Sequence, residues 1–234
     1  MATPRERARE RTMVEIRALA WKQVEDLGAP ALSLRAIARD LGVVSSAIYR
    51  YVASRDDLLT ALLVEGFSDL AEAVDAAEAG APADDYRQRW LTICRAMRTW
   101  ALGRPAAWGL LYGGPVPGYF APQQETSPPG TRVLRRLAAA IVEAKLAGVL
   151  RPRIGPAAGL GTVSPQHRAM VEAIAQKNDI PVDGEIVALG ILGWTAVLGV
   201  ISAEVFEQLG PEGAPALSML ADTQFESIAD ALGF

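Results

Sequence analysis

Residues 32–59 read LSLRAIARDLGVVSSAIYRYVASRDDLL, and this stretch decides the fold of the N-terminal part of the chain. Apolar Leu34, Ile37 and Leu41 recur at intervals of three and four residues, so they line one face of a short helix. Gly42 follows at once, at a position where a helix that ends in a left-handed residue favours glycine. A second short helix is predicted after this turn. Two short helices joined by a tight turn are the usual device for placing a helix in the DNA major groove.

The helical pattern extends on both sides of this stretch. Ser33 and Ser54 are suitable N-caps because a serine hydroxyl accepts a hydrogen bond from a free backbone N–H of the first turn. Gly28 is expected to end the first helix. The predicted N-terminal helices span residues 5–27, 34–41, 45–52 and 55–78.

These residues resemble the DNA-binding domain of the TetR/AcrR family of bacterial transcriptional regulators over roughly residues 10–70. The matching positions are Ser33, Ile37-Ala38, Leu41-Gly42-Val43, Tyr49-Arg50-Tyr51 and Ser54 to Leu59. The chain departs from the family pattern at three positions. Tyr51 stands where the family often has His, Val52 where it often has Phe, and Val44 where a Ser or Thr commonly caps the recognition helix.

The resemblance implies a set of DNA-contacting residues, with Tyr49, Tyr51 and Arg55 expected on phosphates. Backbone N–H groups near a helix start favour anions, so Ser33 and Arg35 at the start of the second helix are also expected to contact phosphates. The base readers are expected on the third helix, where an arginine can bind guanine bidentately and an alanine can meet a thymine methyl group. In the alternative interpretation Tyr49 packs partly in the core and Arg50 is only solvated. The full expected set is Ser33, Arg35, Ser45, Ser46, Ala47, Tyr49, Arg50, Tyr51 and Arg55.

The charge distribution fits contact with phosphate at one end of the protein. Residues 1–55 hold ten Lys/Arg and six Asp/Glu, whereas residues 56–234 hold thirteen and twenty-one. The N-terminal part is therefore basic although the whole chain has a net charge of −4. Charge scatter of this size also arises by chance. The single cysteine, Cys94, and the charged N-terminus without an apolar stretch favour a cytoplasmic protein.

The remainder of the chain, residues 80–234, is predicted to form a second, helical domain for ligand binding and dimerisation. The first domain is expected over residues 1–55, with a linking helix from 55 to about 79. Residues 113–130 are rich in Pro and Gly and are predicted to form an irregular loop, which could gate a pocket. The predicted helices of this part span residues 83–102, 104–112, 131–147, 165–177, 181–209 and 213–232, with Pro211 separating the last two.

This second part resembles a TetR subgroup named for a Trp-His-Gly signature. Residues 104–119 match the segment that precedes the signature, and Trp194 and Gly199 match the signature itself. Leu198 replaces the signature histidine. If that histidine has a polar role in relatives, the role is absent from this chain.

Large side chains of the second part suggest a pocket for a small apolar effector, because such pockets are concave and mostly apolar. For any one aromatic residue, packing in the core is the more common role. Arg95, Arg98 and Arg104 could pair with an acidic ligand or form a solvated face. The candidate effector-binding residues are Trp90, Met97, Trp100, Trp108, Tyr112, Phe120 and Trp194.

The last two helices are expected to form a dimer interface. Their apolar stripes suit a four-helix bundle around a two-fold axis, and two-fold symmetry predicts a palindromic operator. Residues 186–203 carry no charge. The length of this segment is at the lower edge for a membrane span. A buried or interface helix is favoured over a span, because glutamates and not basic residues flank the segment. The predicted stripes are Ile191, Trp194, Leu198 and Ile201, and Leu217, Leu220, Phe225 and Ile228.

The sequence gives little support for catalysis or for a bound cofactor. His167 is the only histidine, and one histidine with Cys94 does not make a metal cluster. The glycines of residues 155–161 lack the Lys-Ser/Thr of a phosphate-binding loop. We therefore predict an all-α, homodimeric, ligand-responsive repressor that is not an enzyme. The alternatives are a DNA-binding dimer without a small-molecule ligand and a membrane-associated protein.

Overall fold

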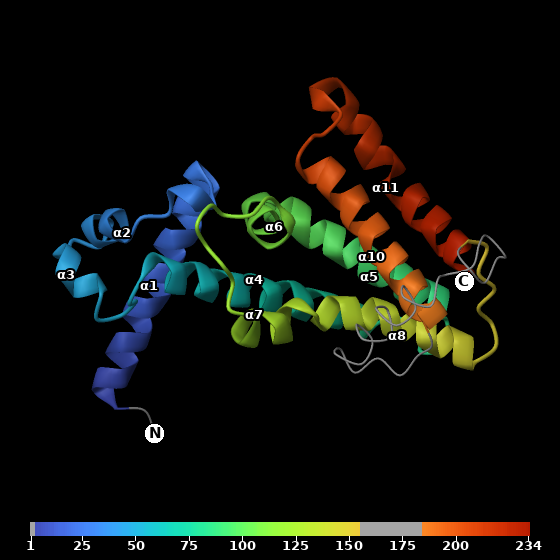
Figure 1. Ribbon diagram of the computed structural model, residues 1–234, viewed down its shortest axis with the longest axis horizontal. Coiled ribbons are helices and arrows are strands. Elements are labelled where there is room, and N and C mark those ends of the chain that lie inside the picture. Colours follow the sequence, from blue (N-terminus) through green and yellow to red (C-terminus); the bar gives the residue numbers. More distant parts are fainter. Residues whose placement is uncertain (1–2, 155–183) are drawn as a thin grey trace. The chain divides into compact units, whose positions relative to one another are not determined.

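The computed structural model describes residues 3–154 and 184–234, and every regular element in these ranges is a helix. The predicted all-α class is confirmed. The helix expected at 165–177, His167 and the glycines of 155–161 lie outside the described residues. The helices, labelled in Figure 1, are α1 Pro4–Leu27, η1 Ala29–Ala31, α2 Leu34–Asp40, α3 Ser45–Ile48, α4 Arg55–Glu78, α5 Tyr86–Gly103, α6 Pro105–Tyr112, α7 Gln123–Gly130, α8 Arg132–Leu146, α10 Gly184–Val205 and α11 Gly210–Leu232.

The chain folds into two compact units. Unit 1 comprises residues 1–69 and 104–129, and unit 2 comprises residues 70–103 and 130–234. Unit 1 therefore includes α6 and α7 from the middle of the sequence. The sequence-based division at residues 55–80 assigned this segment to the second domain. α4 is one continuous helix that contributes residues to both units.

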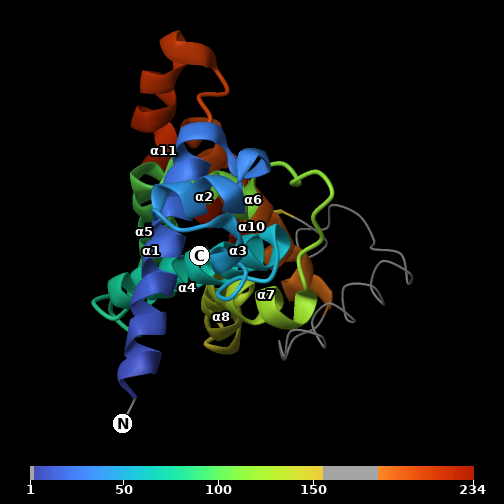
Figure 2. The ribbon, with the colours of Figure 1, turned by 90° about the vertical axis from the view of Figure 1, so that its left-hand side faces the viewer.

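Unit 1 is built around α1, with α2 and α3 side by side on one flank of it (Figures 1 and 2). The Ser33 hydroxyl caps α2 by accepting a hydrogen bond from the Ala36 N–H. Gly42 has φ +70°, the left-handed conformation expected after α2. The buried apolar side chains of this unit include Ile16, Ala20, Val24, Leu34, Ile37, Ile48, Val52, Leu58, Leu59 and Leu62.

Local capping signals gave accurate helix boundaries at several points. The Ser54 hydroxyl accepts a hydrogen bond from the Asp57 N–H at 3.0 Å, so Ser54 caps α4 as predicted. α3 is shorter than predicted, because residues 49–51 continue as turns after Ile48. Pro211 lies in the first turn of α11, where the missing N–H costs no hydrogen bond, so it does not separate α10 from α11 as predicted.

The prediction of an irregular loop over the whole of residues 113–130 was wrong at its C-terminal end. α7 begins at Gln123, directly after Pro122, whose carbonyl accepts hydrogen bonds from the N–H and the hydroxyl of Thr126. Pro128 and Pro129 come only after the first turn has formed. A proline removes only its own donor, and the residues that supply the first donors here are not prolines.

Unit 2 contains residues 70–78 of α4 together with α5, α8, α10 and α11, and α5 and α10 pack against each other and against both α8 and α11. α5 contributes a continuous buried stripe, and α11 packs on both α5 and α10. The buried side chains of α5 are Trp90, Leu91, Ile93, Cys94, Met97, Trp100 and Ala101.

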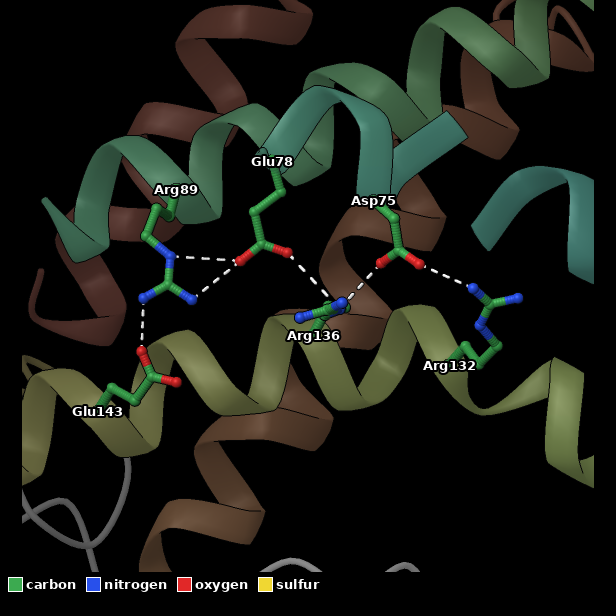
Figure 3. A network of polar contacts seen from close by, with 6 residues as sticks. All are labelled: Asp75, Glu78, Arg89, Arg132, Arg136 and Glu143. Carbon is green, nitrogen blue, oxygen red and sulfur yellow. Dashed lines mark hydrogen bonds and ion pairs between the residues drawn. The ribbon is translucent and has the colours of Figure 1, made fainter. Parts of the chain in front are cut away.

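A network of charged side chains joins three helices of unit 2 (Figure 3). The Glu78 carboxylate of α4 accepts a hydrogen bond of 2.9 Å from the Arg89 guanidinium of α5, and Arg89 also donates to the Glu143 carboxylate of α8. The Asp75 carboxylate of α4 accepts hydrogen bonds from Arg132 and Arg136 of α8 at 2.7 and 2.9 Å. The network fixes the C-terminal half of α4 to its two neighbours through residues that are 11 to 61 positions apart in sequence.

α10 contains the apolar segment noted in the sequence. Within the described residues, Ile186–Val205 has a mean hydropathy of 2.2 and is long and apolar enough to cross a membrane. One side of the helix packs against α5, α8 and α11, and 33% of the segment is buried. Ile191 and Leu192 lie on the exposed side.

Candidate nucleic-acid interface

The turn between α2 and α3 positions the candidate base-reading residues. The Gly42 N–H donates to the Arg39 carbonyl and the Val43 N–H to the Ala38 carbonyl, so the end of α2 closes on itself. Ile48 of α3 is buried in the core of unit 1 and anchors the helix on its inner side. The outer side of α3 is thereby held in a fixed orientation.

Three of the expected base readers lie on α3, and the fourth, Arg50, lies in the turn directly after it. Ser45, Ser46 and Arg50 are exposed, and Ala47 is half-buried. Serine hydroxyls and a guanidinium standing out from a short helix are groups that can bind base edges in the major groove. The structure therefore brings the four predicted base readers together at one end of unit 1.

The two tyrosines expected on phosphates differ in their surroundings. Tyr49 is the C-cap of α3 and is half exposed. Tyr51 is half-buried and packs against the core of unit 1. Tyr49 is the more accessible phenol, and its half exposure is compatible both with contact to a phosphate and with partial packing in the core.

Ser33 and Arg35 lie at the start of α2. The Ser33 hydroxyl caps the helix, and the Ser33 backbone N–H donates to the Gln23 Oε1 at 3.0 Å. Arg35 is exposed on the first turn of α2. Ser33 is therefore already committed to shaping the backbone, whereas the Arg35 side chain is accessible to solvent.

Arg55 is engaged within unit 1 more fully than the sequence suggested. Its Nε donates to the Leu32 carbonyl at 3.1 Å, and its Nη2 donates to the carbonyls of Ala29 and Pro30 at 3.2 and 3.0 Å. These bonds tie the start of α4 to the segment before α2. No sequence signal pointed to carbonyl partners more than 20 residues away.

The first turns of α1 add positive charge to unit 1. A full capping box of Thr3 and Glu6 starts the helix, and residues 4–11 are all exposed. Both ribbon views show these turns extending past α2 and α3 (Figures 1 and 2). The exposed basic residues here are Arg5, Arg7, Arg9 and Arg11.

The candidate effector residues are divided between the two units. Trp90, Met97, Trp100 and Trp194 belong to unit 2. Within it the three α5 residues are buried, and Trp194 of α10 is half-buried. The remaining candidates, Trp108, Tyr112 and Phe120, belong to unit 1.

The three unit 1 candidates have unlike environments. The Trp108 and Tyr112 ring centroids are 4.5 Å apart, and Tyr112 also makes an edge contact with Phe67. Burial raises the pKa of the Tyr112 phenol well above its ordinary value. Phe120 is 90% exposed, so its ring lines no enclosed site within unit 1.

The Pro-Gly segment that could gate a pocket belongs to unit 1 up to residue 129. Val116 and Tyr119 lie against the core formed by α1 to α4. The hydroxyls of Tyr119 and Thr60 are 2.8 Å apart, a hydrogen bond between this segment and the first half of α4. Burial is the main cause that raises the Tyr119 pKa. The segment thus helps to hold α4 where that helix leaves the helix-turn-helix.

The arginines considered for an acidic ligand are paired within the chain. Arg95 contacts Asp222 and Glu226 of α11. Arg98 holds Glu204 through two bonds of 2.6 Å. Arg104 pairs with Asp69. These pairs bind α5 to the C-terminal hairpin and α6 to α4.

The structure gives little sign of chemistry at other residues. Burial raises the pKa of the Cys94 thiol well above its ordinary value, so the thiol stays protonated and unreactive at neutral pH. Among residues 3–154 and 184–234, no group of three or more His, Cys, Asp or Glu side chains is placed to hold a metal ion.

Replacing Arg50 with alanine is expected to weaken specific DNA binding by about 1–3 kcal/mol and to relax the preference at one base pair per half-site. Arg50 is exposed in the turn directly after α3, next to the exposed serines of that helix. Fluorescence anisotropy with single-base operator variants measures both effects. Arg35→Ala is the control, because loss of a phosphate contact weakens all sequences equally. An Arg50→Ala protein with unchanged affinity and unchanged preference would contradict the role.

Comparison with known proteins extends these observations over most of the chain. A sequence profile described as "Bacterial regulatory proteins, tetR family" matches residues 16–62, and one described as "Tetracyclin repressor-like, C-terminal domain" matches residues 90–228. The chain is 45% identical over 206 residues to the HTH-type transcriptional regulators Rv1816 of Mycobacterium tuberculosis and Mb1846 of Mycobacterium bovis. These alignments cover 88% of this chain and 85% of each relative.

Solved structures share the fold. The regulatory protein SCO4313 has a TM-score of 0.74 and 28% identity, over 97% of this chain and 98% of its own. The transcriptional regulator FadR from Bacillus subtilis, solved in complex with stearoyl-CoA, has a TM-score of 0.64 and 12% identity, over 93% of this chain and 98% of its own. The likeness to FadR shows a common fold and no more.

Proposed function

The chain belongs to the TetR family of bacterial transcriptional regulators, and on that basis we propose that it is a homodimeric cytoplasmic repressor of a palindromic operator, released by a small-molecule effector. The observation that carries the DNA-binding part is the outer side of α3. Its serines and Arg50 stand exposed while Ile48 fixes the helix in the core.

The last two helices support the dimer. α10 and α11 pack against each other and still leave large apolar side chains in solvent. Of the stripes predicted for the interface, Ile201, Leu217 and Phe225 are buried within the protomer, because the hairpin turns that row inward. The exposed apolar side chains of the two helices are available to a second copy, because exposed apolar surface of this kind can mark a protein–protein contact. They are Ile191, Leu192, Met219 and Leu220.

We propose that the effector is recognised mainly by apolar contacts in unit 2. Its α5 buries two tryptophans and a methionine in a largely apolar core, and its arginines at 95 and 98 are already paired with carboxylates of the same chain. Recognition by apolar contact is therefore favoured over recognition by free charge. Ligand binding would favour a dimer geometry in which the two α3 helices no longer match successive major grooves.

Replacing Leu220 with glutamate is expected to convert the dimer to a monomer at micromolar concentration, because the change buries an unpaired charge in the interface. Sedimentation velocity measures the oligomeric state, and operator affinity should fall with it, since each half-site is then bound singly. Gln88→Glu adds the same charge at an exposed position of α5 and serves as the control. A wild-type protein that sediments as a monomer would overturn the proposed architecture.

The first test of the whole proposal is selection of genomic fragments by the purified protein, followed by a salt titration on the best fragment. A recovered palindrome whose affinity falls steeply with salt supports a dimer that neutralises phosphates. Absence of enrichment would remove the DNA-binding proposal. Compounds made or consumed by products of the adjoining genes are then added to the complex, and a compound that dissociates it is the effector.

A further inference from the structure

We propose that Val44 is a specificity-determining residue, which reads the methyl group of a thymine at the edge of the operator half-site. The inference rests on the proposed DNA binding through α3 and adds a contact that the expected set of base readers does not contain.

Val44 is apolar and yet 71% exposed. It directly precedes α3 as the N-cap residue, with φ −65° and ψ 142°. Its carbonyl accepts a hydrogen bond from the Ala47 N–H at 2.8 Å, so its backbone is tied to the helix. Since a β-branched side chain also has few rotamers, the two methyl groups are held in a nearly fixed direction.

The side chain has no place in the core. Ile48 fills the inner side of α3, and the hydrogen bond from the Val43 N–H to the Ala38 carbonyl locks the preceding turn. Val44 cannot turn inward while that turn persists. The exposed methyl groups are thus a property of the folded interface and not of a loose loop.

The position of Val44 gives the exposed side chain more weight than a lone surface valine has. The N-cap is where a Ser, Thr, Asp or Asn side chain stabilises a helix, and α3 has only four residues. Valine forms no side-chain cap there. The sequence forgoes a cap at the one helix that is expected to enter DNA, which points to a use for the methyl groups.

The neighbours of Val44 identify the partner. Ser45 and Ser46 follow it directly and are exposed, and both are expected to meet base edges. An isopropyl group can make no hydrogen bond to phosphate or to a polar base edge. The thymine C5-methyl group is the apolar feature that the major groove offers, so Val44 and a thymine are complementary.

The test uses full-length protein and the selected operator, with each thymine replaced in turn by uracil. This change removes the methyl group and leaves every hydrogen-bonding group in place. For the wild type, affinity is expected to fall about 3- to 10-fold at one symmetric thymine pair, as for the loss of apolar contacts of one or two methyl groups. For Val44→Ala, the same replacement should change affinity less than 2-fold.

Two further variants separate base reading from helix stability. Val44→Ser supplies a cap, so it should raise the melting temperature while it abolishes discrimination between thymine and uracil at the thymine pair that Val44→Ala no longer distinguishes. Val43→Ala alters the neighbouring exposed valine and should leave that discrimination intact. Equal sensitivity to uracil in the wild type and in Val44→Ala, or no sensitive thymine at all, would overturn the role of Val44. Failure to select any operator would instead overturn the proposed function.

Discussion

The Arg98→Ala protein is expected to lose about 3–4 kcal/mol of its free energy of unfolding, because the substitution leaves a buried carboxylate without its partner. The Glu204 side chain is 7% exposed and the Arg98 side chain 21%. The guanidinium donates to both Glu204 oxygens and also to the hydroxyl of Ser218. Urea unfolding monitored by circular dichroism measures the loss.

Arg95 offers a matched control on the same helix. It pairs with Asp222 and Glu226, but both carboxylates are largely exposed, so Arg95→Ala should cost no more than about 1 kcal/mol. The combined change of Arg98→Met and Glu204→Leu should recover most of the loss, since a buried ion pair can be replaced by apolar residues of similar volume. Equal losses for Arg98→Ala and Arg95→Ala would contradict this account.

The effect of Arg98→Ala also depends on pH. Hydrogen bonds from Arg98, in the first place, lower the Glu204 pKa below 4.5 in the folded protein. A lowered carboxyl pKa contributes stability at neutral pH, and this contribution is lost as pH falls through the folded-state value. Without Arg98, burial favours the protonated acid. The difference in stability between wild type and variant should therefore be largest near neutral pH. It should shrink as pH falls through the raised Glu204 pKa of the variant and then through the lowered Glu204 pKa of the wild type.

The features that the sequence predicted well are those set by neighbouring residues. Ser33, Gly42 and Ser54 act within one helical turn, and each produced the predicted helix end. Apolar spacing placed the long helices to within a few residues. The exposed outer side of α3 also followed from local spacing, since Ile48 alone fixes which side faces inward.

The features that the sequence did not predict depend on contacts between distant residues. The partners of Arg55 are 23 to 26 residues away, and Tyr119 meets Thr60 across 59 positions. A Pro-Gly-rich segment shows where a helix is interrupted but not which surface the segment covers. For the same reason the aromatic residues of the candidate effector set could not be sorted between the two units from their spacing.

The Arg89→Ala protein is expected to lose about 2–3 kcal/mol of its free energy of unfolding, somewhat less than Arg98→Ala. The Arg89 side chain is 14% exposed and that of its partner Glu78 9%, so this pair is about as buried as Arg98 and Glu204. Figure 3 shows the contact. Glu78 nevertheless keeps a second cation, Arg136, at 3.7 Å. The carboxylate is therefore not left wholly unpaired when Arg89 is removed.

The site of this loss is what gives the Arg89 substitution its functional interest. Arg89 fixes the C-terminal half of α4 to α5 and α8, and α4 is the continuous helix that also begins at the helix-turn-helix. Hydrogen exchange should therefore quicken most at amides 70–78, not uniformly through unit 2. Arg132→Ala removes a more exposed partner of Asp75, which keeps Arg136, so its cost should stay within about 1 kcal/mol. Faster exchange spread evenly over α5, α10 and α11 would show that Arg89 stabilises unit 2 in general and does not specifically hold α4.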